Sequence, residues 1–250
     1  MKSNVVEWLS EVPFAHRGLH SSGIPENSMP AFEAAAEAGY GIELDIHGTV
    51  DGYLIVFHDD NTLRMTGQDL RVTQVESGVL SGLRLDGTQY QIPLFEDVIA
   101  RVAGRVPILI EIKPGTPMDQ AGPPLLRILD GYVGPTAIQS FDPRIVGWVK
   151  EHAPYVIRGQ LSSSFSGGGL SLTKRWLLRS MALNAVTRPQ FIAFDIDSMP
   201  SIAVQLWKSV LRIPLLLWTV RTEEQVKKAE RYGANLIFEG FRPTLRAENS

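Results

Sequence analysis

Cysteine is absent from this chain of 250 residues, which excludes disulfide bridges and thiolate metal sites. No apolar run approaches the roughly 18 uninterrupted residues of a membrane-spanning helix. The N-terminal stretch MKSNVVEWLSEVPF also lacks the continuous apolar core of a signal peptide. Neither sign of charge is in large excess, and the net charge of −3 argues against a nucleic-acid partner, which usually needs a basic surface. These absences predict a cytoplasmic location.

Short apolar runs alternate with amphipathic segments along the whole chain. They predict strands at residues 12–15, 41–46, 54–57, 107–112, 136–140, 156–161, 191–196, 214–220 and 235–239. Only the residues HGTVDGY separate the second and third runs, so these two read as a hairpin, and eight strand–helix units remain. This number favours a (β/α)8 TIM barrel, with a doubly wound open sheet as the alternative.

Two local features refine this interpretation. Ser28 is expected to cap a helix that has Pro30 in its first turn. Residues 59–97, rich in Gly, Thr, Ser and Asp, predict a small insertion after the second strand, packed over one end of the barrel. We expect one domain over residues 1–250.

Carboxylates alternate along the second predicted strand and recur on the next barrel strand. Glu43 and Asp45 share one face, and Glu111 and Lys113 repeat the same spacing in ILIEIKPG. In a barrel, such residues near strand ends reach the mouth of the active site. Three carboxylates at one mouth would repel each other, and a hard cation such as Mg²⁺ or Ca²⁺ removes that conflict. We favour this metal site over pairing of each acid with a Lys or Arg.

Two histidines also end apolar runs. His16 closes the first, beside Arg17, and His58 closes the LIVFHDD run. Together they can act as general acid and general base near neutral pH. The guanidinium group of Arg17 presents several N–H donors in one plane, which suits the oxygens of a phosphate. With a metal and Lys113, this set indicates attack on an anionic phosphorus centre.

An ordered set of motifs extends this interpretation: AHRG, PENSMPAFEAAAEAG, IELDI, DG, FHDDNTLRMTG, IPLFEDVI, ILIEIKP, QSFDP and LWTV. In this order they closely resemble the glycerophosphodiester phosphodiesterase family, over roughly residues 13–243. The resemblance implies a (β/α)8 barrel with an insertion after the second strand. One departure is Phe238 and Glu239 near the end of the last strand, where a Thr-Asp pair is usual.

The resemblance also implies a role for individual positions. It implies His16 and His58 as the acid–base pair, Glu43, Asp45 and Glu111 as ligands of the divalent metal, and Arg17, Lys113, Trp218 and His47 as substrate contacts. The implied reaction is hydrolysis of a small glycerophosphodiester to an alcohol and glycerol 3-phosphate, in which the neighbouring glycerol hydroxyl attacks phosphorus. The sequence leaves open which histidine is the base, which alcohol leaves and the oligomeric state.

Three other functions compete with this one. The first is a phospholipase-D-like phosphodiesterase that acts on lysophospholipids at a membrane surface. Its support is the stretch LTKRWLLRSMALNAV, which has basic residues and no acidic ones. An ordinary barrel helix is the favoured interpretation of that stretch. The others are a Schiff-base aldolase that uses Lys113, and a binding protein with an inactive site.

Overall fold

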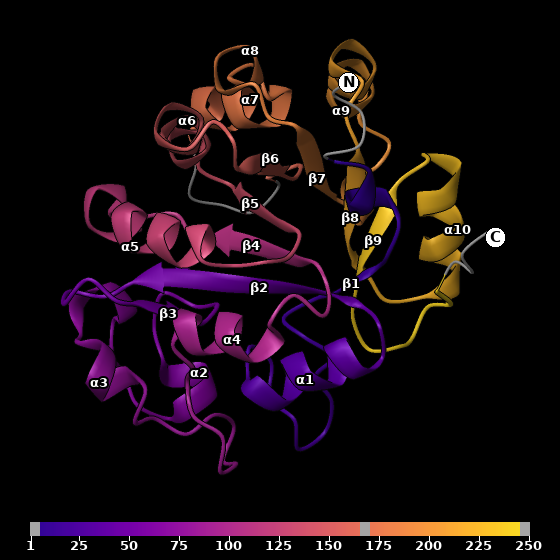
Figure 1. Cartoon of the computed structure of the whole chain (residues 1–250). Coiled ribbons are helices and arrows are strands. Elements are labelled where there is room, and N and C mark those ends of the chain that lie inside the picture. The colour runs from indigo at the N-terminus through magenta and orange to yellow at the C-terminus, as the bar shows by residue number, and fades with distance from the viewer. Residues whose placement is uncertain (1–5, 166–170, 246–250) are drawn as a thin grey trace. The chain divides into compact units, whose positions relative to one another are not determined.

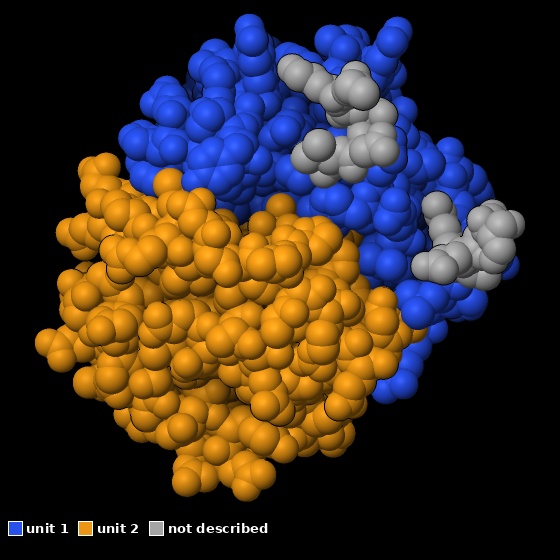
Figure 2. Space-filling view, in the orientation of Figure 1, with its two compact units in different colours: residues 1–13, 137–250 blue, residues 14–136 orange. Residues whose placement is uncertain are grey.

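The computed structural model describes residues 6–165 and 171–245. The chain forms two compact units (Figure 2). Unit 2 comprises residues 14–136, and unit 1 comprises residues 1–13 and 137–250. The expected single domain stays a prediction.

Unit 2 contains four strands and the helices between them (Figure 1). Its elements are β1 (Phe14–Ala15), α1 (Met29–Glu37), β2 (Gly41–Gly48), β3 (Leu54–Val56), α2 (Leu63–Thr66), the 3-10 helix η2 (Val72–Gln74), α3 (Ser77–Leu80), α4 (Phe95–Val102), β4 (Ile108–Ile112) and α5 (Met118–Asp130). β2 pairs in parallel with β1 and β4, and antiparallel with β3, so the predicted hairpin is confirmed.

Unit 1 contains the remaining strands. Its elements are η1 (Glu7–Ser10), β5 (Thr136–Ser140, whose first residue lies in unit 2), α6 (Pro143–His152), β6 (Ile157–Ser162), α7 (Leu172–Ser180), α8 (Asn184–Thr187), β7 (Phe191–Asp195), η3 (Ile196–Ser198), α9 (Ile202–Leu211), β8 (Leu215–Val220), α10 (Glu223–Arg231) and β9 (Asn235–Phe238). β5 to β9 follow one another in chain order, each parallel to the next. A doubly wound sheet would reverse its strand order at one point, and β5 to β9 contain no such reversal.

All nine predicted strands are confirmed, with ends within about two residues of the expected ones. β2 shows why the apolar runs were reliable: every one of its residues is buried. Such a strand reads as a nearly continuous apolar run, into which only functional side chains introduce polarity.

One local expectation needs correction. Ser28 is the N-cap of α1, but its hydroxyl donates a 2.5 Å hydrogen bond to the Pro25 carbonyl and does not cap the helix. Residues 59–97 form short helices, and α4 already begins at Phe95. They enclose their own apolar cluster, which includes Met65, Val72, Leu80 and Leu85. Their status as an insertion stays a prediction.

Across the described ranges, no helix combines the length and the apolar character that a bilayer span requires.

Candidate active site

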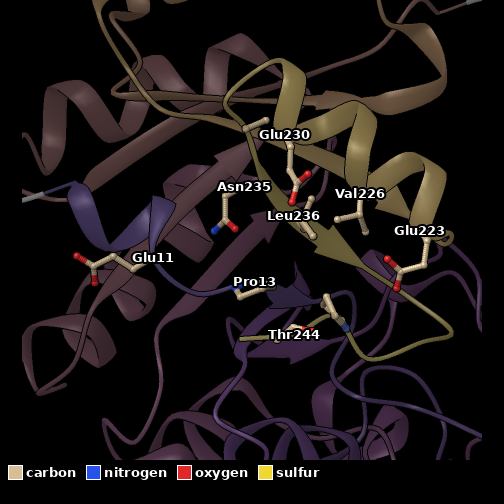
Figure 3. A pocket seen from close by; sticks show the side chains of 10 residues that line it. Glu11, Pro13, Glu223, Val226, Glu230, Asn235, Leu236 and Thr244 are labelled. Atoms are coloured by element: carbon tan, nitrogen blue, oxygen red, sulfur yellow. The ribbon is translucent and has the colours of Figure 1, made fainter. Parts of the chain in front are cut away.

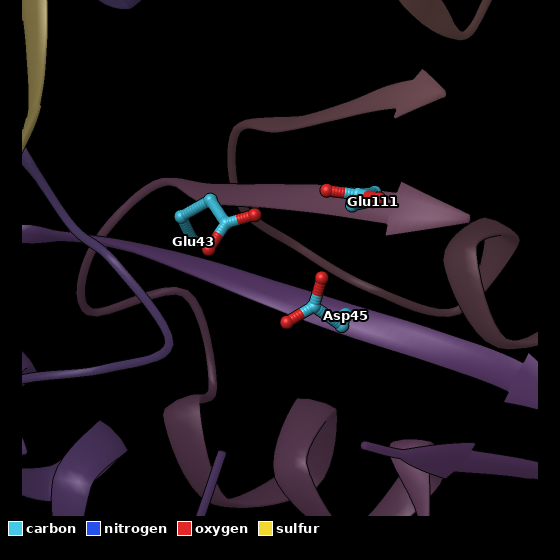
Figure 4. Close-up of side chains that lie close together, drawn as sticks. All are labelled: Glu43, Asp45 and Glu111. Atoms are coloured by element: carbon cyan, nitrogen blue, oxygen red, sulfur yellow. The ribbon is translucent and has the colours of Figure 1, made fainter. Parts of the chain in front are cut away.

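Three carboxylates gather on two neighbouring strands of unit 2 (Figure 4). Glu43 and Asp45 lie at alternate positions of β2 and therefore share a face. Glu111 of β4 is the register partner of Asp45. One oxygen from each residue lies within 4.8 Å of the others, and all three side chains are buried. The structure thus brings together the three predicted metal ligands.

Lys113 is the cation inside this cluster. Its Nζ lies 3.3 Å from Asp45 Oδ1 and 2.7 Å from Glu111 Oε1. Burial lowers the pKa of Lys113, but the two carboxylates more than offset this and raise it above its ordinary value. For the acid Asp45 burial has the opposite effect and raises the pKa. The charges of Lys113, His58 and Arg17 nevertheless hold this pKa well below its ordinary value. Asp45 and Lys113 are therefore a charged pair.

The other two carboxylates are less well compensated. Burial raises the pKa of Glu43 well above its ordinary value, and the charges of Asp45 and Glu111 raise it further. For Glu111, burial outweighs the lowering effect of Lys113, and the pKa rises to about 7. A hard divalent cation binds oxygen ligands whose negative charge is not fully offset, and Lys113 offsets only part of the charge of these three carboxylates. The residues present therefore fit Mg²⁺ or Ca²⁺ and can hold such an ion.

Arg17 connects the first strand to this cluster. Its backbone N–H donates to Glu43 Oε2 at 3.1 Å, its Nη1 donates to Glu26 Oε1 at 2.8 Å, and its Nε lies 3.5 Å from Asp45 Oδ2. Gly18 follows in a left-handed conformation, with φ of +79°, and a Cβ there would lie 2.8 Å from that of Ala31. The turn therefore requires glycine after the arginine.

His58 follows β3 and is held from two sides. Its Nδ1 lies 2.6 Å from Asp59 Oδ1. The Nε2 of His47 lies 3.3 Å from the His58 carbonyl, so this Nε2 carries the proton that the carbonyl accepts. Burial lowers the pKa of both imidazoles. His47 is fully buried, whereas His58 is 32% exposed and can reach a substrate.

A chain of ion pairs and hydrogen bonds runs from Arg17 to His58. Arg64 Nη2 donates to Glu26 Oε1 at 2.7 Å, and its Nε donates to Asp59 Oδ2 at 2.6 Å. Glu26 thus joins two arginines, and Asp59 joins Arg64 to His58. Sequence reasoning missed Glu26, Asp59 and Arg64, which it used only as letters of family motifs.

Asn27 is a further residue that sequence reasoning missed. It is buried and left-handed, with φ of +51°. Its Nδ2 donates to Asp45 Oδ2 at 2.8 Å, and its backbone N–H donates to the Arg17 carbonyl at 2.9 Å. A polar residue between Glu26 and Ser28 gives no local signal of this contact.

Two further predicted residues lie on different units of the chain. His16 directly follows β1 and is half-buried. Trp218 belongs to unit 1, on β8, where its ring packs edge-on against Phe141 at a centroid distance of 5.6 Å. Phe165 packs edge-on against the same Phe141 ring at 6.0 Å. These three rings form an aromatic cluster in unit 1.

Unit 1 also has a pocket of about 200 Å³ between α10, β9 and the segments before β1 and after β9 (Figure 3). Glu11, Glu223 and Glu230 are its carboxylates. Among the described residues, the only group with metal-binding spacing is Glu43, Asp45 and Glu111. The carboxylates of this pocket do not form such a group.

Comparison with solved structures identifies the fold. A phosphodiesterase of Oleispira antarctica, solved in complex with its product sn-glycerol-3-phosphate, superposes with a TM-score of 0.75 over 91% of this chain and 93% of that one, at 21% identity. The parallel strands that alternate with helices are those of the predicted (β/α)8 barrel, which is confirmed. The class of protein is a (β/α)8 barrel with a carboxylate cluster on β2 and β4.

Comparison with models of protein families identifies the family to which the chain belongs. The family model described as "Glycerophosphoryl diester phosphodiesterase family" matches residues 16–239. The chain belongs to this family of phosphoric diester hydrolases, as its motifs predicted.

Two curated relatives match a smaller part of the chain. A glycerophosphodiester phosphodiesterase of Bacillus altitudinis is 38% identical over 107 residues, which are 40% of this chain and 43% of the relative. A lysophospholipase D of Rattus norvegicus is 32% identical over 112 residues, 40% of this chain and 35% of the relative. The matched segments thus span less than half of each relative's length.

Proposed function

We propose that this protein hydrolyses glycerophosphodiesters to an alcohol and glycerol 3-phosphate and depends on a divalent metal ion. The observation that carries the proposal is the buried cluster of Glu43, Asp45 and Glu111, with Lys113 and Arg17 against it. The name of the Bacillus altitudinis relative and the product bound to the Oleispira antarctica structure support the substrate class.

The proposed acid–base pair is His16 and His58. Asp59 accepts the Nδ1 proton of His58, and this leaves Nε2 free to take or give a proton in the reaction. One histidine removes the proton of the glycerol hydroxyl that attacks phosphorus, and the other protonates the leaving alcohol. The cyclic phosphate formed in this step is then opened by water to give glycerol 3-phosphate. A bound divalent cation would neutralise the phosphate charge that develops during attack.

The remaining predicted residues bind and orient. Arg17 and Lys113 would hold the phosphate oxygens through charge-assisted hydrogen bonds. His47 would fix the main chain at His58, because its Nε2–H donates to that carbonyl. Trp218 would contact the alcohol portion, as the family resemblance implies.

The test is release of glycerol 3-phosphate from glycerophosphocholine and glycerophosphoethanolamine by the purified chain. We expect release that EDTA abolishes and that added Mg²⁺ or Ca²⁺ restores. Folded Glu111→Gln should give no metal-restored activity, whereas His152→Ala serves as a control, since His152 bonds the Trp148 carbonyl within its own helix. Absence of release with any ion would reject the proposal.

A lysophospholipid is the alternative substrate. The observation in its favour is the relative named lysophospholipase D, together with an indole in the LTKRWLLRSMALNAV stretch, Trp176, that is 69% exposed. Choline release from lysophosphatidylcholine, measured beside that from glycerophosphocholine, separates the two. A preference for the lysolipid would favour the alternative.

The cytoplasmic location and the lack of a nucleic-acid partner stay predictions.

A further inference from the structure

An apolar stripe runs along the exposed side of α9 in unit 1. Ile202, Leu206 and Val210 follow one another at intervals of four residues, which places them on one side of the helix. Their exposed fractions are 90%, 59% and 63%. Eight residues of helix rise about 12 Å, so the stripe extends over that length. Single exposed apolar residues are ordinary, but a continuous row indicates a contact surface.

Helix α7 extends this surface. Trp176 is 69% exposed, and a groove of about 380 Å³ lies between α7 and the start of α9, lined by Trp176 and Arg179 on one side and Ile202 on the other. The indole N–H of Trp207 donates to the Ser180 carbonyl at 3.0 Å and ties the two helices together. We call this surface the α7–α9 face, formed by Trp176, Arg179, Ile202, Leu206 and Val210; Arg212 follows at the C-terminal end of α9.

The segment that carries the α7–α9 face is rich in basic residues, although the whole chain carries −3. Residues 171–212 contain six Lys and Arg but two acids, Asp195 and Asp197. Asp195 accepts from the Ser198 hydroxyl and Asp197 accepts from the Gln225 amide, and the basic residues of this segment exceed its acids by four. Arg179 and Arg212 are exposed, so their charge is available to a partner.

We propose that the α7–α9 face binds an anionic lipid surface. The stripe would enter the boundary between headgroups and acyl chains, Trp176 would lie at the level of the headgroups, and the arginines would contact lipid phosphates. A second copy of the chain fits less well, because a symmetric dimer through this face would place like charges opposite each other. The proposal concerns docking and does not depend on which diester the active site cleaves.

Co-sedimentation with vesicles tests this docking. The full chain is mixed with vesicles of phosphatidylcholine alone or with about 30% phosphatidylglycerol, at low salt and at about 0.5 M NaCl. We expect pelleting with the anionic vesicles at low salt and its loss at high salt. Arg179→Gln should lower the partition coefficient roughly fivefold, and Leu206→Ser by a similar factor or more.

Matched controls come from unit 2. Val133 is 89% exposed, and Arg127 is an exposed arginine, so Val133→Ser and Arg127→Gln change the same chemistry elsewhere. Both should pellet like the unchanged protein. Hydrolysis of water-soluble glycerophosphocholine, measured on every preparation, should not change and reports that each variant is folded. If no preparation, including the unchanged protein, hydrolyses glycerophosphocholine while vesicle binding is intact, the proposed function is rejected and the docking proposal still holds.

Three outcomes would overturn the docking proposal. One is no pelleting with anionic vesicles at low salt. Another is pelleting that neither Leu206→Ser nor Arg179→Gln weakens. The third is a dimer in sedimentation velocity that Leu206→Ser dissociates, which would assign the stripe to a second copy.

Discussion

Asn27 and Asp45, 18 residues apart in the sequence, are joined by a 2.8 Å hydrogen bond from the Asn27 amide to the Asp45 carboxylate. The side-chain oxygen of Asn27, Oδ1, also accepts a hydrogen bond from the Asp45 backbone N–H at 3.4 Å. Asn27 thus fixes the orientation of a predicted metal ligand from a residue that does not itself belong to the carboxylate cluster.

Loss of this amide should weaken the metal site. Asn27→Gly keeps the left-handed backbone but removes both side-chain bonds, and outer ligands of this kind typically contribute 10–100-fold in metal affinity or activity. We therefore expect a 10–100-fold rise in the Mg²⁺ concentration that gives half-maximal activity. Titration of activity with Mg²⁺ measures this shift. An unchanged titration curve would show that Asp45 needs no such support.

Glu43→Gln should separate stability from activity. Burial and two neighbouring carboxylates disfavour the charged form of Glu43, so the neutral amide relieves repulsion in the metal-free protein. In EDTA we expect an equal or higher Tm, whereas hydrolysis should fall by at least about 10²-fold. Thermal unfolding and glycerol 3-phosphate release measure the two effects.

The control for Glu43→Gln is Glu33→Gln, which removes an outer acid paired with Arg101 and Arg105. It should leave activity unchanged, and its Tm should stay equal or fall slightly. A lower Tm in Glu43→Gln than in Glu33→Gln would contradict the account of Glu43.

The pKa of Glu111 predicts a dependence of stability on pH. In the folded chain the pKa is about 7, against an ordinary value of 4.5. Between these values the folded protein binds more protons than the unfolded chain does, so the free energy of unfolding falls as the pH rises from about 4.5 to about 7. Urea unfolding in EDTA at several pH values measures this slope. Glu111→Gln should make this slope shallower, because the variant lacks the Glu111 titration. The other titrating groups remain, so some slope persists. An identical slope in both proteins would refute the raised pKa of Glu111.

Loss of either histidine should reduce turnover. His16→Ala and His58→Ala remove a proton donor or acceptor, and general acid–base groups typically contribute 10²–10⁴-fold. We expect kcat to fall by about that factor, with the metal requirement unchanged. Steady-state kinetics on glycerophosphocholine check this, with His152→Ala as the variant that keeps full activity. Normal turnover in His16→Ala or His58→Ala would exclude that residue from the acid–base pair.

The sequence by itself determined the strands and the positions of the clustered carboxylates. Buried strands such as β2 read as apolar runs because a residue inside a parallel sheet meets no water on either face. Polar residues stand out in such a run, and for this reason the sequence indicates Glu43, Asp45 and Glu111 as candidate functional residues. Their approach follows from register, since alternate residues share a face and Asp45 pairs with Glu111.

Only the tertiary structure decided the supports around these residues. The bond from Asn27 to Asp45 and the pair between Arg64 and Glu26 join residues 18 and 38 positions apart, so no local periodicity encodes them. The exposure of the apolar stripe on α9 could not be predicted from the sequence either. Leu206 and Val210 belong to a pattern that an ordinary packed helix also has. Whether such a face packs inward or meets solvent depends on the neighbouring elements, and here they leave it exposed.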